Sequence, residues 1–216
     1  MPKEFPTARP FLPRVLTLPG LERAAKGCQG CGLYRNAIQT VFGEGAPRAR
    51  VMLIGEQPGD QEDKQGRPFV GPAGRVLDRA LADAAIDRSD TYVTNVVKHF
   101  KNELRGKRRI HKKPLASEIA ACMPWLEAEM EVVHPEVLVC LGATASQALL
   151  GRSFRLTRQR GTMLPHPRAR RILATVHPSA LLRIPEQLDR HEEYARFVDD
   201  LRVVRTWLVR PARRAS

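Results

Sequence analysis

Four short runs of mostly apolar residues divide the chain and predict β-strands. Each run is continuously apolar rather than alternating, which is typical of parallel strands covered by helices on both faces. The runs span residues 50–55, 91–97, 137–141 and 171–176.

Apolar residues between these runs recur at helical spacing. One predicted helix carries Leu77, Ala80, Leu81, Ala84 and Ala85. A second carries Ile119, Cys122, Met123 and Leu126, at i, i+3, i+4 and i+7. The alternation of strands and helices predicts an α/β fold with three layers, α/β/α, around a central, mostly parallel four-stranded sheet. Such sheets bind ligands beyond the carboxyl ends of their strands, so the residues after each run are the first candidates for function.

The length of 216 residues and a hydrophobic content of 43% fit one globular domain. Five prolines within residues 1–20 predict an extended N-terminal arm, followed by a single domain over 21–209 and a basic tail over 210–216. No run reaches the roughly 20 apolar residues that cross a bilayer, and the N-terminus lacks an apolar leader. We therefore expect a cytoplasmic monomer without a membrane partner.

Positive charge concentrates in one segment of the chain. The 36 lysines and arginines exceed the 23 acidic residues by 13, which favours a polyanionic partner such as nucleic acid over a charge that only aids solubility. Within residues 98–113, Glu103 is the one acidic residue, whereas the basic residues are Lys98, Lys101, Arg105, Lys107, Arg108, Arg109, Lys112 and Lys113. A smaller basic group, Arg210, Arg213 and Arg214, lies in the predicted tail.

The four cysteines form a candidate metal site. Cys28 and Cys31 make a CxxC pair, Cys122 lies on a predicted helix, and Cys140 ends a predicted strand. The pair alone also fits a redox dithiol, and the last two cysteines alone fit an ordinary core. Four thiolates favour a metal, but their spacing does not separate zinc from an iron–sulfur cluster.

Polar residues and glycine-rich turns follow the first predicted strand. Turn formation and helix capping explain the glycines and prolines of residues 55–63 and 66–74, but not the acidic Glu56, Asp60 and Asp63, nor Phe69 in a glycine-rich loop. Asn95 follows the second strand and His177 the fourth. Each residue alone fits a buried structural role. Because polar groups follow three of the four predicted strands, however, the combination favours a site that reads the edge of a base.

These motifs resemble the uracil-DNA glycosylase superfamily, close to its iron–sulfur family 4. The resemblance covers residues 28–207 and rests on the four cysteines and the motifs GEQPGDQED, GRPFVGPAG, TNVVKHF and HPSALL. It implies excision of uracil from DNA that is single-stranded or has a flipped base. It also implies a [4Fe–4S] cluster on Cys28, Cys31, Cys122 and Cys140.

The resemblance also implies roles for the residues at the strand ends. Phe69 would stack on uracil, and Asn95 would read its edge and reject cytosine, with Gln57 beside them in the uracil site. His177 would donate to the uracil oxygen on which negative charge develops as the glycosidic bond breaks.

Residues 106–112, GKRRIHK, resemble the loop of an X-type branch whose histidine becomes covalently joined to DNA. Gln57 agrees with that branch and stands where the best-known family has a water-activating Asp, so that family's hydrolytic mechanism does not transfer. The implied catalytic set is His111 as nucleophile, Glu56 as its partner, Asp60 in support, and His177. The implied DNA contacts are Lys107, Arg108, Arg109, Lys112, Lys113 and Ser179.

Two alternatives remain at the level of sequence. One is a family 4 hydrolase that turns over repeatedly and carries an unusual basic loop. The other is a non-enzymatic, metal-stabilised nucleic-acid-binding protein, for which the charge and cysteines suffice but Glu56, Asn95 and His177 are surplus.

Overall fold

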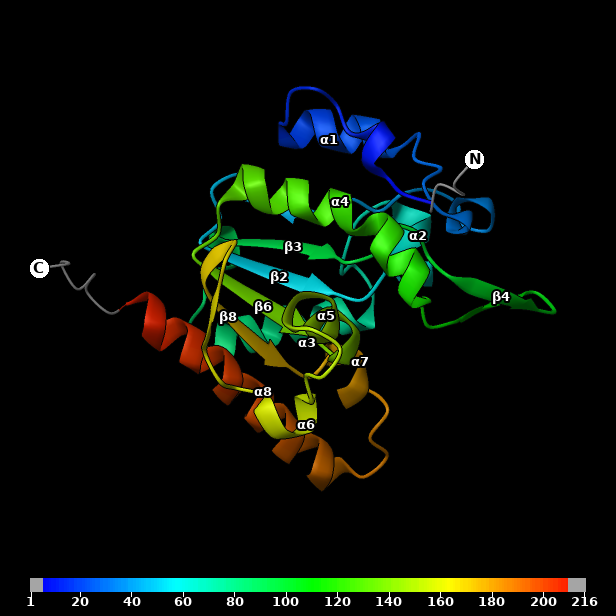
Figure 1. Ribbon diagram of the computed structural model, residues 1–216. Helices are drawn as coiled ribbons and strands as arrows, with labels where there is room; N and C mark the ends of the chain where they lie inside the picture. The colour runs from blue at the N-terminus through cyan, green and yellow to red at the C-terminus, as the bar shows by residue number, and fades with distance from the viewer. Residues whose placement is uncertain (1–5, 210–216) are drawn as a thin grey trace, which may run out of the picture.

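A six-stranded sheet forms the centre of the computed structural model, which describes residues 6–209 (Figure 1). Its order is β1-β3-β2-β6-β8-β7. The strands are β1 (Glu44–Gly45), β2 (Val51–Gly55), β3 (Thr91–Asn95), β6 (Val137–Leu141), β7 (Leu164–His166) and β8 (Ala169–Thr175). The four inner strands are mutually parallel, and β1 and β7 pair antiparallel at the two edges.

This arrangement confirms the α/β/α fold but corrects the count of four strands to six. The two edge strands have only two and three residues, which is too short for a hydrophobic pattern to show. Pro165 within β7 also weakens its strand signal, because proline is confined mostly to sheet edges.

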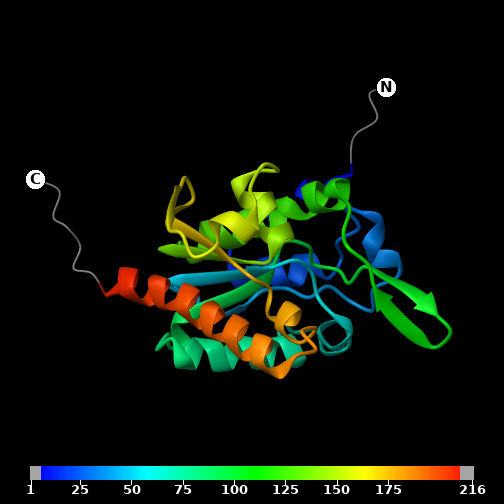
Figure 2. The same cartoon turned by 90° about the horizontal axis from the view of Figure 1, so that it is seen from below.

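Helices cover both faces of the sheet (Figures 1 and 2). Side chains of α4 and α5 pack on one face and those of α3, α7 and α8 on the other, while α1 packs on the outer side of α4. The helices are α1 (Leu18–Ala25), α2 (Asp60–Gln65), α3 (Pro72–Asp83), α4 (Ala116–Val133), α5 (Ala143–Leu150), α6 (Leu156–Gln159), α7 (Pro178–Leu181) and α8 (Gln187–Leu208). Short 3-10 turns span Arg9–Phe11, Gly32–Arg35 and Arg88–Asp90.

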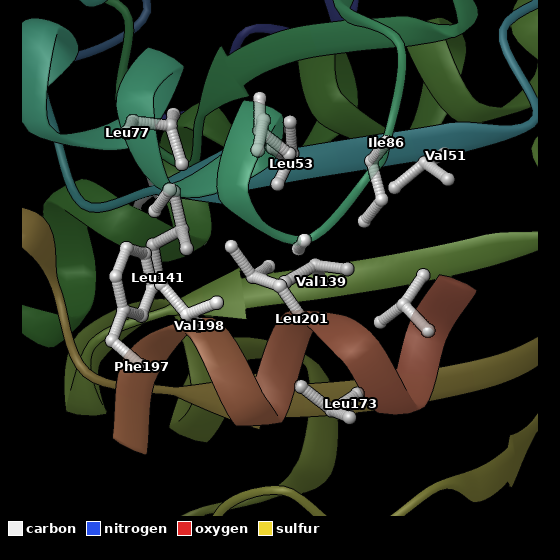
Figure 3. Close-up of a cluster of buried hydrophobic side chains, with 14 of the residues drawn as sticks. Val51, Leu53, Leu77, Ile86, Val139, Leu141, Leu173, Phe197, Val198 and Leu201 are labelled. Carbon is white, nitrogen blue, oxygen red and sulfur yellow. The ribbon is translucent and has the colours of Figure 1, made fainter. Parts of the chain in front are cut away.

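The two-residue period of β2 divides its side chains between two cores. Val51 and Leu53 face α3 and α8, where Leu77 and Leu201 meet them (Figure 3), and Met52 and Ile54 join the core under α4 and α5. Every residue of β2, β3 and β6 is buried, as the continuous apolar runs predict. Burial on both faces therefore fixes the sheet edge at which the functional residues lie.

Both predicted helices form, with one correction. The apolar positions of α3 are buried as far as Ala84, but Ala85 is exposed and adopts a left-handed conformation with φ of 56°. The helix therefore ends before Ala85, and the next buried side chain is Ile86, at the start of the connection to β3.

A separate two-stranded hairpin, β4 (Asn102–Arg105) and β5 (Arg108–His111), projects from the body of the molecule (Figures 1 and 2). It occupies the basic segment of the sequence. The N–H of Lys112 donates to the carbonyl of Lys101 at 3.0 Å, so the two ends of the hairpin lie side by side.

The N-terminal segment includes one short turn and the start of α1 within residues 6–20. Ala8 is buried there and its N–H donates to the carbonyl of Ala121 on α4 at 2.8 Å. The predicted basic tail over 210–216 lies outside the described residues. Over residues 6–209, no helix is both long enough and apolar enough to cross a membrane.

Candidate active site

A cleft of about 860 Å³ opens at the carboxyl ends of the inner strands, where the fold predicts a ligand site. The cleft brings together most of the residues that sequence analysis singled out from distant segments. Among its lining residues are Glu56, Gln57, Asp60, Phe69, Asn95, His111, Lys113, His177 and Ser179.

Gly55 lets two of these side chains approach the last residue of β2. A Cβ at this position would lie 2.3 Å from the Asn95 Oδ1 and 2.9 Å from the Phe69 ring. Asn95 is only 3% exposed, and within residues 6–209 its carboxamide makes no hydrogen bond although it borders the cleft. A buried carboxamide with its donor and acceptor unused is suited to reading the edge of a base.

The Phe69 ring stacks approximately parallel to the His177 ring, with centroids 6.0 Å apart and an interplanar angle of 27°. Phe69 holds a left-handed φ of 55°, and a side chain at Gly74 would collide with its carbonyl oxygen. Non-glycine residues adopt this conformation at an energetic cost and often at functional sites. The loop is therefore built to present an aromatic face to the cleft.

His177 presents one ring nitrogen to the cleft in a defined protonation state. Its Nδ1 accepts from the N–H of Ser179 at 3.1 Å and lies 2.8 Å from the Ser179 hydroxyl oxygen. Since Nδ1 is an acceptor, the neutral ring carries its proton on Nε2. Burial, aided by the positive charge of Arg183, lowers the pKa of His177 to about 4, so the ring is a neutral donor at pH 7.

Glu56 and His111 meet across the cleft although they are 55 positions apart. The Glu56 Oε1 lies 3.5 Å from the His111 Nε2, and its other oxygen accepts from the Thr144 hydroxyl. The hairpin thus carries an imidazole to the carboxylate that follows β2. Half of the His111 side chain remains exposed to solvent.

Gln57 joins the base of the hairpin to the end of β2. Its Oε1 accepts from the Lys101 N–H at 3.0 Å, which leaves Nε2 to donate to the Lys112 carbonyl at 3.0 Å and to the His111 Nε2 at 2.8 Å. The structure therefore places Gln57 against the hairpin, and its amide orders the predicted nucleophile.

Arg109 is engaged within the protein. It forms ion pairs with Asp60 at 2.6 Å and with Asp63, and its guanidinium lies 5.4 Å from the centroid of the Phe100 ring. Asp60 is also paired with Lys64, and these two cations lower the pKa of Asp60, Lys64 having the larger effect. The geometry thus gives Arg109 and Asp60 the task of fastening the hairpin to α2.

The basic segment separates into exposed and engaged side chains. Lys107, Arg108 and Lys113 are exposed, whereas Lys112 pairs with Glu103 at 2.5 Å. Lys98 is buried, and Lys101 pairs with Glu118 at 2.8 Å on α4. The number of cations available to a polyanion is therefore smaller than the sequence alone suggests.

Ser179, another predicted DNA contact, orients His177.

Three of the four cysteines share one region. Cys28, Cys31 and Cys122 belong to the cluster between the N-terminal segment and α4. Burial raises the pKa of the Cys122 thiol to about 12, and the nearby Cys31 and Cys28 thiols also raise it. The Trp125 Nε1 donates to the Cys28 Sγ at 3.2 Å, and the Lys98 N–H donates to the Cys122 Sγ at 3.3 Å. Such N–H donors are suited to thiolate sulfurs.

Cys140 lies apart from this group. It faces the core under α4 and α5, and burial alone raises the pKa of its thiol. Among residues 6–209, no set of three or more His, Cys, Asp or Glu side chains converges closely enough to hold a single metal ion. An iron–sulfur cluster needs wider spacing than one ion, because each thiolate binds a different iron.

His99, Thr144 and Glu62 are not among the residues that the sequence predicts for the site. His99 adjoins Lys98, is 5% exposed, and makes no ring hydrogen bond within residues 6–209. Glu62 accepts from the N–H groups of Gly59 and Gly71 at 3.1 and 2.7 Å, which ties the two loops after β2 together. These contacts depend on tertiary structure, so no local pattern reveals them.

The fold and the cleft together define an α/β protein in which a cleft at the strand ends brings together an aromatic platform, a carboxamide and two histidines. The family model described as "Uracil DNA glycosylase superfamily" matches residues 42–202, and the chain belongs to that superfamily.

The chain is similar to several proteins named type-4 uracil-DNA glycosylase. It is 39% identical to one from Thermotoga maritima over 73% of this chain and 79% of the relative. It is 33% identical to one from Pyrobaculum aerophilum over 79% of this chain and 87% of the relative. A protein from Thermus thermophilus named type-5 uracil-DNA glycosylase is 33% identical over 64% of this chain and 68% of the relative.

Proposed function

We propose that the chain excises uracil from DNA and then forms a covalent bond to the abasic sugar through His111. The observation that carries this proposal is the position of the His111 Nε2, 3.5 Å from the Glu56 carboxylate and in the same cleft as Asn95 and His177. Family membership and the named activity of the relatives support the first half of the proposal. The placement of His111 supports the second.

The cleft recognises a base that has left the helical stack. A flipped or single-stranded uracil stacks on Phe69 and offers its edge to the Asn95 carboxamide, whose amide and carbonyl pair with O4 and N3–H. Cytosine presents an amine and an unprotonated nitrogen at the same positions, so it mismatches both groups.

Bond cleavage leaves negative charge on the uracil and positive charge on the sugar. The electrons of the C1′–N1 bond depart with uracil, and the His177 Nε2–H donates to the uracil O2, where the charge gathers. His177 performs this as a neutral ring because burial lowers its pKa to about 4. The Glu56 carboxylate stabilises the positive charge that develops at C1′.

The His111 imidazole then captures C1′. The Nε2 lone pair forms the new C1′–N bond, and the proton on Nδ1 leaves to solvent, so the linked ring ends neutral. The Gln57 amide holds this nitrogen as an acceptor beforehand and must release it for the attack. The exposed Lys107, Arg108 and Lys113 bind flanking phosphates.

A denaturing gel with a uracil-containing oligonucleotide tests the covalent step. We expect a protein–DNA species that survives denaturation together with one free uracil per complex. Free uracil without the slow-migrating species would support the second candidate, a type-4 hydrolase that turns over repeatedly. The hydrogen bond that Gln57 makes to His111 favours that candidate, because it occupies the nucleophilic lone pair.

We further propose that Cys28, Cys31 and Cys122 hold a [4Fe–4S] cluster with a structural role. Their common region and the two N–H donors to sulfur support these ligands. Cys140 lies apart, whereas His99 is buried and directly follows Lys98, whose backbone N–H donates to the Cys122 Sγ, so His99 is the candidate fourth ligand. A bound cluster would tie the N-terminal segment to α4 and to the end of β3.

A further inference from the structure

The buried ammonium of Lys98 is bonded to the strand end that carries Asn95. Its Nζ donates to the Thr94 hydroxyl at 2.6 Å, to the Asn95 carbonyl at 2.8 Å and to the Glu129 carboxylate at 2.5 Å. The three N–H bonds of an ammonium are thereby all used. The side chains of Lys98 and Glu129 are 1% and 0% exposed, so water does not compete for these contacts.

Glu129 on α4 completes the network. Its carboxylate also accepts from the N–H of Gly43, from the Tyr92 hydroxyl and from the Thr94 hydroxyl, each at 3.0 Å. Burying two charges is costly, and an apolar pair of similar volume is often no less stable. Stability alone therefore gives no reason for an ion pair at this position, whereas contact with the Asn95 peptide does.

The Asn95 side chain depends on its backbone for orientation. Within residues 6–209 its carboxamide makes no hydrogen bond, so the direction in which it points into the cleft depends on packing against Gly55 and on the position of its backbone. Lys98 holds the carbonyl of Asn95, and the hydroxyl of the preceding Thr94 bonds to both Lys98 and Glu129. The N–H groups of Val96 and Val97 join the same turn to the carbonyls of Gly55 and Glu56 at 3.0 Å.

We propose that Lys98, neutralised by Glu129, is a positioning residue for base selection. Its ammonium holds the Asn95 peptide so that the carboxamide meets the edge of uracil and mismatches that of cytosine. This inference rests on the proposed excision of uracil. Recognition groups must be held within about 0.5 Å of their working geometry, which a fully bonded and buried ammonium achieves.

The test compares binding of two single-stranded oligonucleotides that resist cleavage, one with 2′-fluoro-2′-deoxyuridine and one with 2′-fluoro-2′-deoxycytidine. The test variant is Lys98→Met with Glu129→Gln, which removes both charges and keeps the volume. Tyr92→Phe is the matched control, because it removes one hydrogen bond to Glu129 and leaves the Lys98–Asn95 contact intact.

We expect the uracil preference to fall by about tenfold or more in the double variant, as about 1 Å of misplacement suffices for larger effects. The control should keep the wild-type preference even if its melting temperature falls. A folded double variant with an unchanged preference would overturn the role of Lys98. If the double variant does not fold, Thr94→Val removes one hydrogen bond of the same ammonium. An unchanged uracil preference in Thr94→Val would equally overturn the role of Lys98. Failure of the wild-type protein to prefer uracil would refute the proposed function instead.

Discussion

The Gln57 amide donates to the ring nitrogen of His111 that lies nearest the Glu56 carboxylate. Because this nitrogen accepts, it carries a lone pair rather than a proton, which is the form that a nucleophile requires. The same amide bonds the Lys112 carbonyl, so one side chain fixes the ring, its protonation and the base of the hairpin.

Gln57→Glu should slow the covalent step and leave uracil release largely intact. A carboxylate accepts where the amide donates, so it draws the imidazole proton onto Nε2 and leaves that nitrogen without a lone pair. The trapping rate should fall about tenfold or more, as quenched-flow samples on denaturing gels would show. Gln61→Glu, which adds the same charge to the exposed rim of the cleft, is the control. An unchanged trapping rate in Gln57→Glu would contradict this account.

His111→Ser should abolish the denaturation-resistant complex while free uracil still appears. Serine leaves space through which water reaches C1′, so the product becomes an ordinary abasic site. The exposed His191 on α8 offers a matched control, since His191→Ser should retain the complex. Loss of uracil release in step with trapping would mean that His111 acts before or during bond cleavage.

His177→Asn should make the protein less sensitive to acid. The folded pKa of His177 is about 4 against an ordinary value near 6.5, so the unfolded chain binds the extra proton first. The contribution of the neutral His177 ring to the free energy of unfolding is therefore fully present above pH 6.5 and is lost as pH falls toward 4, by about 2.5 kcal/mol at pH 4.5. Urea unfolding at pH 7 and pH 4.5 measures the loss, and an equal loss in wild type and variant would refute the assignment.

Neutralising Lys107 and Arg108 should flatten the salt dependence of DNA binding. Each phosphate contact contributes about 0.7 to the slope of log K against log salt for single strands, so the double change to glutamine should lower the slope by about 1.4. Arg196 and Arg202, two exposed cations on α8, provide the control pair. An equal change of slope in both pairs would indicate binding by net charge rather than through the hairpin.

Cys122→Ser should deplete the iron of anaerobically purified protein, whereas Cys140→Ser should retain it. The first thiol lies with Cys28 and Cys31, and the second lies in a separate core. His99→Ala should lower iron content or its resistance to chelators. Iron and sulfide analysis, with about four iron atoms per chain in the wild type, decides each case. Zinc without iron would exclude the cluster.

The sheet and the convergence of its strand ends were predictable from the sequence. Continuous apolar runs identify parallel strands, and parallel strands bring their carboxyl ends to one edge, which is why Glu56, Asn95 and His177 meet.

The partners of individual charges were not predictable. Lys98 and Arg109 belong to one basic run in the sequence. In the structure, however, Lys98 is buried in an ion pair with Glu129 and Arg109 pairs with Asp63, and both acidic partners come from distant segments. A local charge pattern contains no information on which side chains tertiary contacts will enclose. Cys140 shows the same limit, because the period of its strand directs it toward the core beneath α4 and α5.

The hairpin that carries His111 begins and ends at the same point in space, since Lys101 and Lys112 are joined by a backbone hydrogen bond. A segment with adjoining ends can be inserted between β3 and α4 without stretching either element. His111, the proposed nucleophile, thus belongs to a transferable hairpin that is anchored by Gln57 on one side and by Asp60 and Asp63 on the other. Moving the hairpin to a related scaffold therefore requires those three anchors to move with it.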